Sequence, residues 1–346
     1  MNIKLAFLLP KLLLLLLTKS AMLVFLLSMM QPQHAFSSIE GEETEKNNPP
    51  DFKSIKKFDS DGNFITSWGT EGDGDGEFLH AHGIAIDSSS GNVYVSDDDK
   101  NSIQKFTSDG KFITSWGSEG IGDGQFLQPE DVAVDSSSGN VFVADFEGNN
   151  IQKFDSDGNF ITKWGIEGTD DGQFQRPWGV AVDSSGNVYT AEESGYRIQK
   201  FDSDGNFITK WGSEGTDDGQ YLHLHDVGVD SSDNVYVTDR DNCKVEKLTT
   251  DGNFIRKWGS LGLDDGEFID PHGIDFDSSD NVYVVDSGNE RIQKFDSDGN
   301  FITKWGSEGT DDGQFWLPHD IAIDSSDNVY VVDSGNVHEK KEICAI

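Results

Sequence analysis

Six residues that could take part in chemistry recur at intervals of 47 or 48 positions along the chain. They are His82, Glu130, Trp178, His225, His272 and His319. Imidazole and carboxylate groups are usual ligands of divalent metals, and three such ligands with an open position form a catalytic rather than a closed structural site. If the fold gathers these positions, they predict a metal site. The alternative is that histidine is only a frequent residue of the repeat and hydrogen-bonds a neighbouring loop.

A repeated unit of four short strands must position these residues. Trp-Gly pairs divide almost the whole chain into six near-copies, at Trp68-Gly69, Trp116-Gly117, Trp164-Gly165, Trp211-Gly212, Trp258-Gly259 and Trp305-Gly306. In the copy that begins at Val227, short alternating apolar runs cover residues 227–230, 235–239, 245–248 and 254–258, which we name strands A to D. Turns rich in Asp, Asn and Gly separate the runs, so each copy is predicted to be an antiparallel meander.

The order of strands at the two ends of the repeat region predicts a closed ring. The region opens with a C and D pair, over residues 55–58 and 64–68, and ends with an A and B pair, over 321–323 and 329–332. Together these halves make one blade, and closure removes the exposed sheet edges of an open stack. We therefore predict an all-β, six-bladed β-propeller of four-stranded antiparallel blades over residues 54–336, with an atypical tail over 337–346.

Strand A starts and strand B ends on the same face of such a propeller, which we call the top face. The six recurring residues lie just before strand A, so they should surround the mouth of the central channel. A second set follows strand B and comprises Asp98, Phe146, Glu193, Arg240, Ser287 and Ser334. At this face we expect Trp178, Glu193 and Trp316 to contact a ligand, since an aromatic ring can stack on one, although half-buried packing would also explain the tryptophans.

The sequence blocks of each copy resemble NHL repeats. The blocks are P-x-G-[IV]-A-[IV]-D, N-V-Y-V-x-D, R-I-Q-K-F and F-x-x-x-W-G, and they cover roughly residues 55–336. The Trp-Asp of WD repeats and the Gly-Gly of kelch repeats are absent from the pattern. The resemblance implies a six-bladed propeller, a fold that hosts many functions.

A second resemblance, to the peptidylglycine α-amidating lyases, suggests roles for single residues. Leu224-His225-Asp226 with Asp239-Arg240, and Pro318-His319-Asp320, look like two of the family's zinc-ligand segments, while Glu130 stands where a third histidine is expected. The resemblance implies that Glu130, His225 and His319 hold zinc or another divalent transition metal. It also implies that Arg240 steadies an anionic substrate group in catalysis and that Asp320 helps to hold a structural calcium. His82 and His272 are alternative ligands outside that alignment.

Composition limits the class of partner and the compartment. The chain has 26 basic and 63 acidic residues, a formal charge of −37, which excludes nucleic acid because phosphate binding needs a concentrated basic surface. Cations, metal ions or basic peptides are the expected partners, and acidity for solubility alone is the alternative. Residues 1–35 resemble a secretory signal, with an uncleaved membrane anchor as the alternative, and 36–53 form an acidic linker expected to be disordered.

Two functional hypotheses follow from these patterns. The first is a secreted or cell-surface binding scaffold, monomeric, whose acidic top face takes a protein, a peptide or a cationic ligand. The second is a metal-dependent lyase or hydrolase at the channel mouth, with a metal-bound water or hydroxide as base. The loops before strand A, such as Glu71-Gly-Asp-Gly-Asp-Gly, are expected to be tight turns, with weak calcium binding as the alternative. The two cysteines, Cys243 and Cys344, are expected not to be bridged to each other unless the C-terminal tail rearranges.

Overall fold

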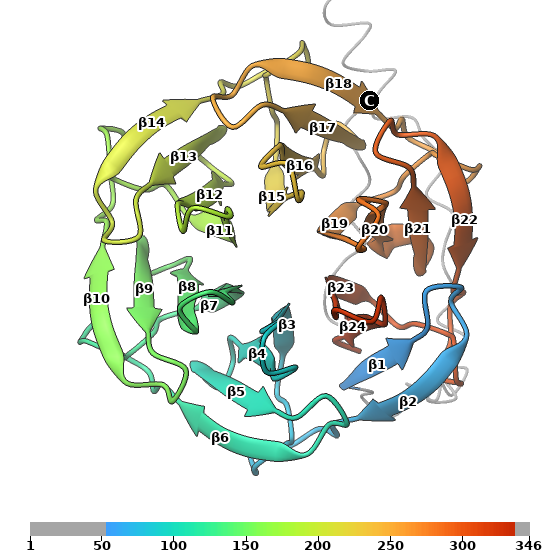
Figure 1. Cartoon of the computed structure of the whole chain (residues 1–346), viewed down its shortest axis with the longest axis horizontal. Coiled ribbons are helices and arrows are strands. Elements are labelled where there is room, and N and C mark those ends of the chain that lie inside the picture. Colours follow the sequence, from blue (N-terminus) through green and yellow to red (C-terminus); the bar gives the residue numbers. More distant parts are fainter. Residues whose placement is uncertain (1–52, 336–346) are drawn as a thin grey trace, which may run out of the picture. The chain divides into compact units, whose positions relative to one another are not determined.

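The computed structural model describes residues 53–335, which form six four-stranded antiparallel sheets arranged as the blades of a ring (Figure 1). The A strands are β3 (Ala81–Ile86), β7 (Pro129–Asp135), β11 (Pro177–Val182), β15 (Leu224–Val229), β19 (Pro271–Phe276) and β23 (Pro318–Ile323). The B strands are β4 (Val93–Asp97), β8 (Asn140–Asp145), β12 (Val188–Glu192), β16 (Val235–Asp239), β20 (Val282–Asp286) and β24 (Val329–Asp333). Blade 1 begins at β3, and blade 6 begins at β23.

The C and D strands complete each blade toward its outer edge. The C strands are β5 (Ser102–Phe106), β9 (Asn150–Phe154), β13 (Arg197–Phe201), β17 (Lys244–Leu248), β21 (Arg291–Phe295) and β1 (Ser54–Phe58). The D strands are β6 (Phe112–Trp116), β10 (Phe160–Trp164), β14 (Phe207–Trp211), β18 (Phe254–Trp258), β22 (Phe301–Trp305) and β2 (Phe64–Trp68). One 3₁₀ turn, η1 (Ser287–Asn289), follows β20. The A strands lie innermost and the D strands outermost (Figure 1).

The ring closes through a blade made from both ends of the repeat region, as predicted. Its sheet has the order β2-β1-β24-β23, and β1 pairs with β24 in an antiparallel register that sets Ile55 opposite Val332 and Lys57 opposite Tyr330. The A strands of neighbouring blades also contact one another around the whole ring, β23 against β3 included. The prediction of an all-β, six-bladed propeller closed by its terminal strands is confirmed.

Hydrophobic residues fill the space between blades. In one such cluster, Tyr236 and Val245 of blade 4 pack with Ile274 and Val282 of blade 5. The tyrosine of this cluster is fully buried because the B strand is covered on both faces by its neighbours. Neighbouring blades therefore share one core between them, and this explains why the strands need the closed ring.

A tryptophan and a glycine tie each blade to the next at the outer wall. The Trp of strand D lies over the Asp-Gly turn between strands C and D of the following blade. A Cβ atom on Gly205 would come 2.5 Å from Cδ2 of Trp164, and Gly205 has φ +85°. Both the backbone conformation and the contact require glycine at this turn.

Strand A begins earlier than predicted, and Cys243 is bridged. In blade 4, β15 starts at Leu224 rather than at Val227, so His225 lies inside the strand.

Cys243 is disulfide-bonded, and the expectation that it is unbridged is wrong. That expectation placed both cysteines by the pattern of the repeat, and the repeat does not determine where Cys344, which follows it, lies. Cys344 and the predictions for 1–35, 36–52 and 336–346 lie outside the described residues.

We predict that Gly205→Ala destabilises the propeller more than Gly219→Ala does. Both glycines have positive φ, +85° and +73°, but a Cβ at Gly219 meets no atom within 4 Å. The Gly219 variant should therefore lose about 1–2 kcal/mol of unfolding free energy for the left-handed backbone alone. The Gly205 variant should lose roughly 1–3 kcal/mol more because the added methyl group displaces Trp164. Urea denaturation followed by circular dichroism measures both, and equal losses would contradict the proposed contact.

Candidate metal centre

The six recurring residues take the second place of their A strands, where the strands begin at the top face, and most of them are buried. His82, His225, His272 and His319 are between 2% and 4% exposed, and Glu130 is 1% exposed. Trp178 is half-buried. Neighbouring A strands carry these side chains to the channel mouth because the ring places equivalent positions at the same height.

The rings of these residues contact one another around the channel. The rings of His225 and His272 are stacked with their centres 3.9 Å apart, and those of His272 and His319 lie 4.9 Å apart. His82 lies 4.3 Å from His319, and Trp178 lies 4.5 Å from His225. Four histidines thus meet at the channel mouth.

Three of these histidines have their ligand atoms close enough to share one ion. One nitrogen each of His225, His272 and His319 lies within 4.8 Å of the other two, and this is the one such group of three that the described residues form. Both ring nitrogens of His225 and Nδ1 of His272 make no hydrogen bond. Burial, with the neighbouring His272 next in importance, holds the pKa of His225 well below its usual range. A neutral imidazole is the form that binds metal.

Glu130 lies beside His82 instead of joining this group. Its Oε2 atom lies 3.0 Å from Nδ1 of His82, and its Oε1 atom accepts a hydrogen bond of 2.5 Å from the side chain of Gln128. The structure brings His225 and His319 of the expected set together with His272, one of the two alternative ligands, and holds Glu130 against His82. The three histidines come from adjacent blades, whereas the expected set came from alternate blades.

Arg240 reaches the histidines through an aspartate that the sequence analysis missed. Its Nε atom donates a hydrogen bond to Oδ1 of Asp270, and the same oxygen lies 3.1 Å from Nε2 of His272. Asp270 is 3% exposed and has φ +60°. Burial raises the pKa of Asp270, but His272 and Arg240 together hold it below its usual value. In this arrangement Arg240 orients Asp270, and Asp270 orients His272.

The missed residues share one place in the repeat. Asp270, His80 and His223 each lie two positions before a recurring histidine, so the spacing of the repeat could have identified them as part of the same face. Nδ1 of His80 lies 2.7 Å from Oδ1 of Asp98. Burial, followed by the positive charge of Arg240, lowers the pKa of His223 to about 3.

The three residues expected to contact a bound ligand, Trp178, Glu193 and Trp316, lie in different surroundings. Trp178 packs edge-on against Phe146, with ring centres 4.9 Å apart, and its ring centre lies 4.5 Å from that of His225. Glu193 pairs with Arg176 at 3.7 Å and with His223 at 3.5 Å, and burial raises its pKa. Trp316 is half-buried in the loop before β23, where its backbone N–H donates to Asp333.

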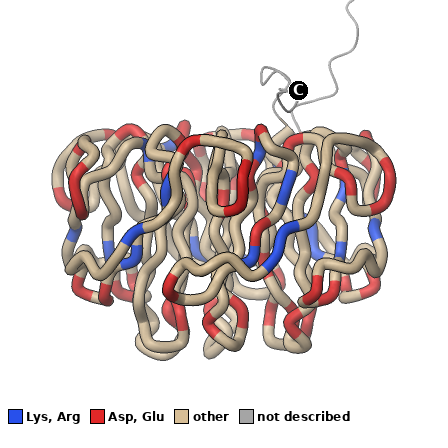
Figure 2. The backbone as a smooth tube through the Cα atoms, turned by 90° about the horizontal axis from the view of Figure 1, so that it is seen from above, with Lys and Arg blue, Asp and Glu red and all other residues tan. Residues whose placement is uncertain are grey.

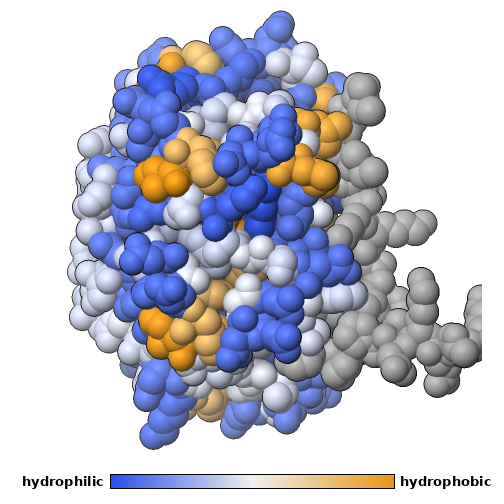
Figure 3. Space-filling view, turned by 90° about the vertical axis from the view of Figure 1, so that its right-hand side faces the viewer, coloured by the Kyte–Doolittle hydropathy of each residue, from blue (hydrophilic) through white to orange (hydrophobic). Residues whose placement is uncertain are grey.

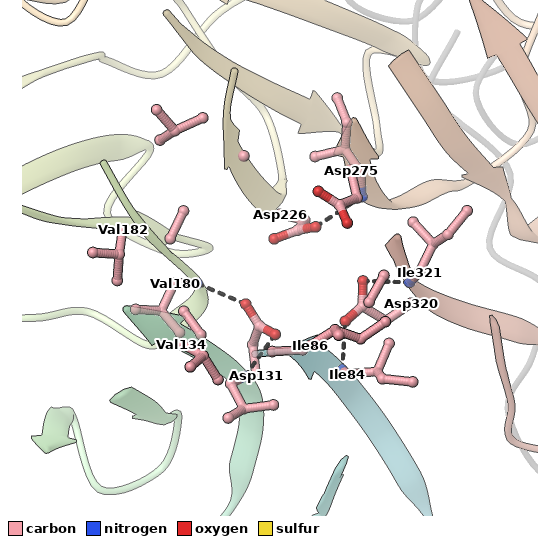
Figure 4. Close-up of a pocket in the computed structure, with 18 of the residues that line it drawn as sticks. Ile84, Ile86, Asp131, Val134, Val180, Val182, Asp226, Asp275, Asp320 and Ile321 are labelled. Atoms are coloured by element: carbon pink, nitrogen blue, oxygen red, sulfur yellow. Dashed lines mark hydrogen bonds between the residues drawn. The ribbon is translucent and has the colours of Figure 1, made fainter. Parts of the chain in front are cut away.

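A layer of carboxylates lies directly after the histidine layer along the channel. The third residue of strand A alternates between glycine and aspartate around the ring, as Gly83, Asp131, Gly179, Asp226, Gly273 and Asp320. Each aspartate accepts hydrogen bonds from the next backbone N–H of its own strand and from the A strand of the following blade. For Asp131 these donors are Val132 and Val180, both at 2.7 Å. The aspartates thus join the inner strands of neighbouring blades (Figure 4).

Asp275 is the one charged residue at its place in the repeat. Ala85, Ala133, Ala181, Gly228 and Ala322 occupy the equivalent positions. Asp275 lines the channel, and its Oδ2 atom accepts a hydrogen bond of 2.6 Å from the N–H of Ile323 (Figure 4). Burial raises its pKa to about 7.

We predict that the stability of Asp275→Ala, compared with that of the unchanged protein, increases as the pH rises from about 4 to 7. Over this range the folded protein keeps a proton on Asp275 that the unfolded chain has released, so its stability falls with rising pH, by up to about 1.4 kcal/mol per pH unit. Alanine removes this dependence. Denaturation midpoints at pH 4.5 and 8 measure it, with the exposed Asp312→Ala as control. If the denaturation midpoints of the variant and the unchanged protein differ by the same amount at pH 4.5 and at pH 8, the raised pKa of Asp275 is contradicted.

Family models match several parts of the chain. A model described as a 6-bladed beta-propeller matches residues 55–107 and 91–167, and the NHL repeat model matches 174–201, 268–295 and 315–341. No curated protein matches the chain.

Solved structures share the architecture at low sequence identity. Virginiamycin B lyase from Staphylococcus aureus is 17% identical with a TM-score of 0.54, over 81% of this chain and 82% of that one. A streptogramin B lyase is 15% identical with a TM-score of 0.56, over 81% and 96%, and a chain of a nidogen–laminin complex is 18% identical with a TM-score of 0.51, over 73% and 92%. At these identities the likeness is one of fold. With the six blades and the matches to both family models, the chain is a six-bladed β-propeller built of NHL repeats.

Proposed function

We propose that this propeller is a secreted or cell-surface binding scaffold that holds a divalent transition metal, zinc foremost, between His225, His272 and His319. The observation that carries the proposal is the meeting of three buried imidazoles, with ligand nitrogens within 4.8 Å of one another. We propose metal binding rather than catalysis here, because the burial of the three histidines is typical of a closed metal site rather than of an open catalytic one.

The chemistry of the three side chains favours a transition metal. Imidazole nitrogen suits zinc, copper, iron and nickel, whereas calcium and magnesium prefer oxygen ligands. Zinc lies at about 2.0–2.1 Å from a histidine nitrogen, so a bound ion would draw the three rings closer together. The contact between Asp270 and His272 is the type of support that metal-binding histidines usually have.

The burial of the cluster bears on the metal-dependent lyase or hydrolase, which remains the alternative. A catalytic metal needs an open position that substrate or water can reach. The cavity lined by His82, His225 and His319 offers about 10 Å³, which is about the room of one water molecule. Arg240, expected to steady an anionic substrate group, is engaged with Asp270. These features support binding over turnover.

The charge of the surface favours a basic protein, a basic peptide or another cationic ligand as partner at the top face. Asp and Glu are frequent in the loops at both ends of the strands (Figure 2). The outer wall shows separate apolar side chains among hydrophilic ones (Figure 3). Isoleucines of the D strands are exposed, such as Ile208 at 48%. Separate residues of this kind do not form a continuous apolar patch. The nidogen–laminin complex supports the idea that a related fold can bind a protein.

The disulfide of Cys243 supports a location outside the cytosol, because disulfides persist in oxidising compartments. Among residues 53–335, no helix has the length and apolar character to cross a bilayer. We propose secretion or display at the cell surface as the setting in which the top face meets its partner.

We predict about one zinc or other transition metal ion per chain in protein purified without chelator or metal-affinity resin. A His225→Ala/His319→Ala double variant should lose it, because two of the three ligands are removed. His223→Ala is the matched control, since it removes a neighbouring histidine of the same face that is not in the group. Elemental mass spectrometry measures the content.

Calcium alone, or no metal in the unchanged protein, would contradict the metal site. Retention of the metal in the double variant would place the ion elsewhere. Loss of the metal in the His223 control as well would show that the effect is structural.

A further inference from the structure

Two departures from the repeat meet in one groove at the top face. Cys243 takes a place that is Asn, Tyr or Glu in four other blades. Leu261 lies in the loop between β18 and β19, at a place where the other five copies have glutamate. Both residues line a cavity of about 570 Å³, together with Lys244, Lys257 and Trp258. The groove is therefore built in part from residues that set blade 4 and the loop after it apart from the other copies.

Leu261 gives the groove an apolar wall. It is 38% exposed, and Trp258 beside it packs against the core shared by blades 4 and 5. In the other five loops the glutamate presents a charge, which disfavours an apolar neighbour. An apolar segment beside Leu261 would remove more of its surface from water, which is favourable. The groove therefore suits an apolar peptide segment.

The disulfide of Cys243 indicates which segment this is. The sequence has two cysteines, Cys243 and Cys344, and Cys243 is disulfide-bonded. Within one chain its partner can only be Cys344, which lies in the segment Glu342–Ile346, of sequence E-I-C-A-I. Apolar residues thus flank this cysteine on both sides. They are the type of side chain that an apolar wall accommodates.

The C-terminal tail starts on the same face as the groove. Ser334, just after β24 of blade 6, has the same place in the repeat as Arg240 of blade 4, three residues before Cys243. Blade 5 lies between them (Figure 1). Cys344 follows Gly335 by nine positions, and nine residues span up to about 30 Å when extended. The tail is therefore long enough to cross one blade.

We propose that residues 336–346 form a strap that crosses the top face over blade 5 and docks in this groove. Cys344 is bridged to Cys243, and the apolar residues beside Cys344 lie against Leu261. While the bridge holds, the strap covers blade 5 beside the channel mouth, and reduction releases it. This proposal is independent of the metal site.

The chemistry of the bridge is thiol–disulfide exchange. Its formation joins the two sulfurs and removes one hydrogen from each thiol. An oxidant of the disulfide class, such as oxidised glutathione, takes up the two electrons and two protons and becomes two thiols. A dithiol reductant reverses the step, since it breaks the bond between the sulfurs and becomes a disulfide itself.

The first test is mass spectrometry of a tryptic digest of the full chain without reduction. Trypsin cleaves after Arg240, Lys244 and Lys341. The strap therefore predicts a product in which Asp241–Lys244 is disulfide-linked to the peptide that begins at Glu342, obtained from the monomer band of a non-reducing gel. Free thiols, or a bridge found only in a dimer band, would overturn the proposal.

The second test asks whether the groove holds the strap. Glutathione redox buffers, followed by alkylation of free thiols, give the equilibrium constant for bridging. Leu261→Glu restores the residue of the other five copies and should lower this constant about tenfold, because apolar contacts are lost. Leu263→Glu is the matched control and should leave it unchanged, since Leu263 is 68% exposed in the same loop and does not line the groove. No change in Leu261→Glu, or an equal change in both variants, would overturn docking in the groove.

The third test is limited trypsin digestion, which measures how tightly the strap is held. Cleavage after Lys341 should be at least about tenfold faster in Cys344→Ser than in the unchanged protein, because proteolysis follows the population of the open form. The unchanged protein treated with dithiothreitol should behave like the variant, and this comparison does not depend on the folding of a variant. Equal cleavage rates with and without the bridge would overturn the strap.

Discussion

Pairing of β1 with β24 is the interaction on which the other features depend, because it closes the ring. The strands lie far apart in sequence, yet their backbones pair along their whole length, from Ser54 opposite Asp333 to Phe58 opposite Val329. Closure places Trp305 over the turn at Gly62 and sets β23 against β3. Only then does every blade have a neighbour on both sides, and only then do six A strands enclose one channel. The histidine and aspartate layers exist because equivalent positions of separate blades are held at one height.

Near-identity of the blades explains the stability of the scaffold, and their differences explain its chemistry. Positions of the repeat such as the Trp of strand D and the Gly of the following turn recur because they form the contacts between blades. The second residue of strand A faces the channel mouth instead, so it varies among His, Glu and Trp. The third residue alternates between Gly and Asp for a geometric reason. A Cβ on Gly83 would come 2.7 Å from the Cα of Asp131, so an aspartate needs a glycine in the preceding blade.

Periodicity made the fold predictable, while side-chain direction limited the prediction of the site. Strand number, turn positions and the composite blade follow from spacing, since a meander of four strands must bury both faces. Spacing also predicts that the histidines meet. It does not predict that Glu130 turns to His82 while His272 stacks on His225, because this depends on rotamers and on Asp270, two positions before His272. The carboxylate ring could be predicted only in part, through Asp320, because the significance of the Gly and Asp alternation requires the pairing between blades.

The two layers in the channel are linked by electrostatics because they share one small cavity. His225 stays neutral there, since burial and the neighbouring His272 lower its pKa, while burial raises the pKa of the aspartates and favours their protonated form. Buried ionisable groups are costly unless they are paired, and the backbone N–H groups satisfy only part of each carboxylate. A metal among the histidines would add positive charge above the aspartates and lower their pKa. It would thereby favour release of their protons.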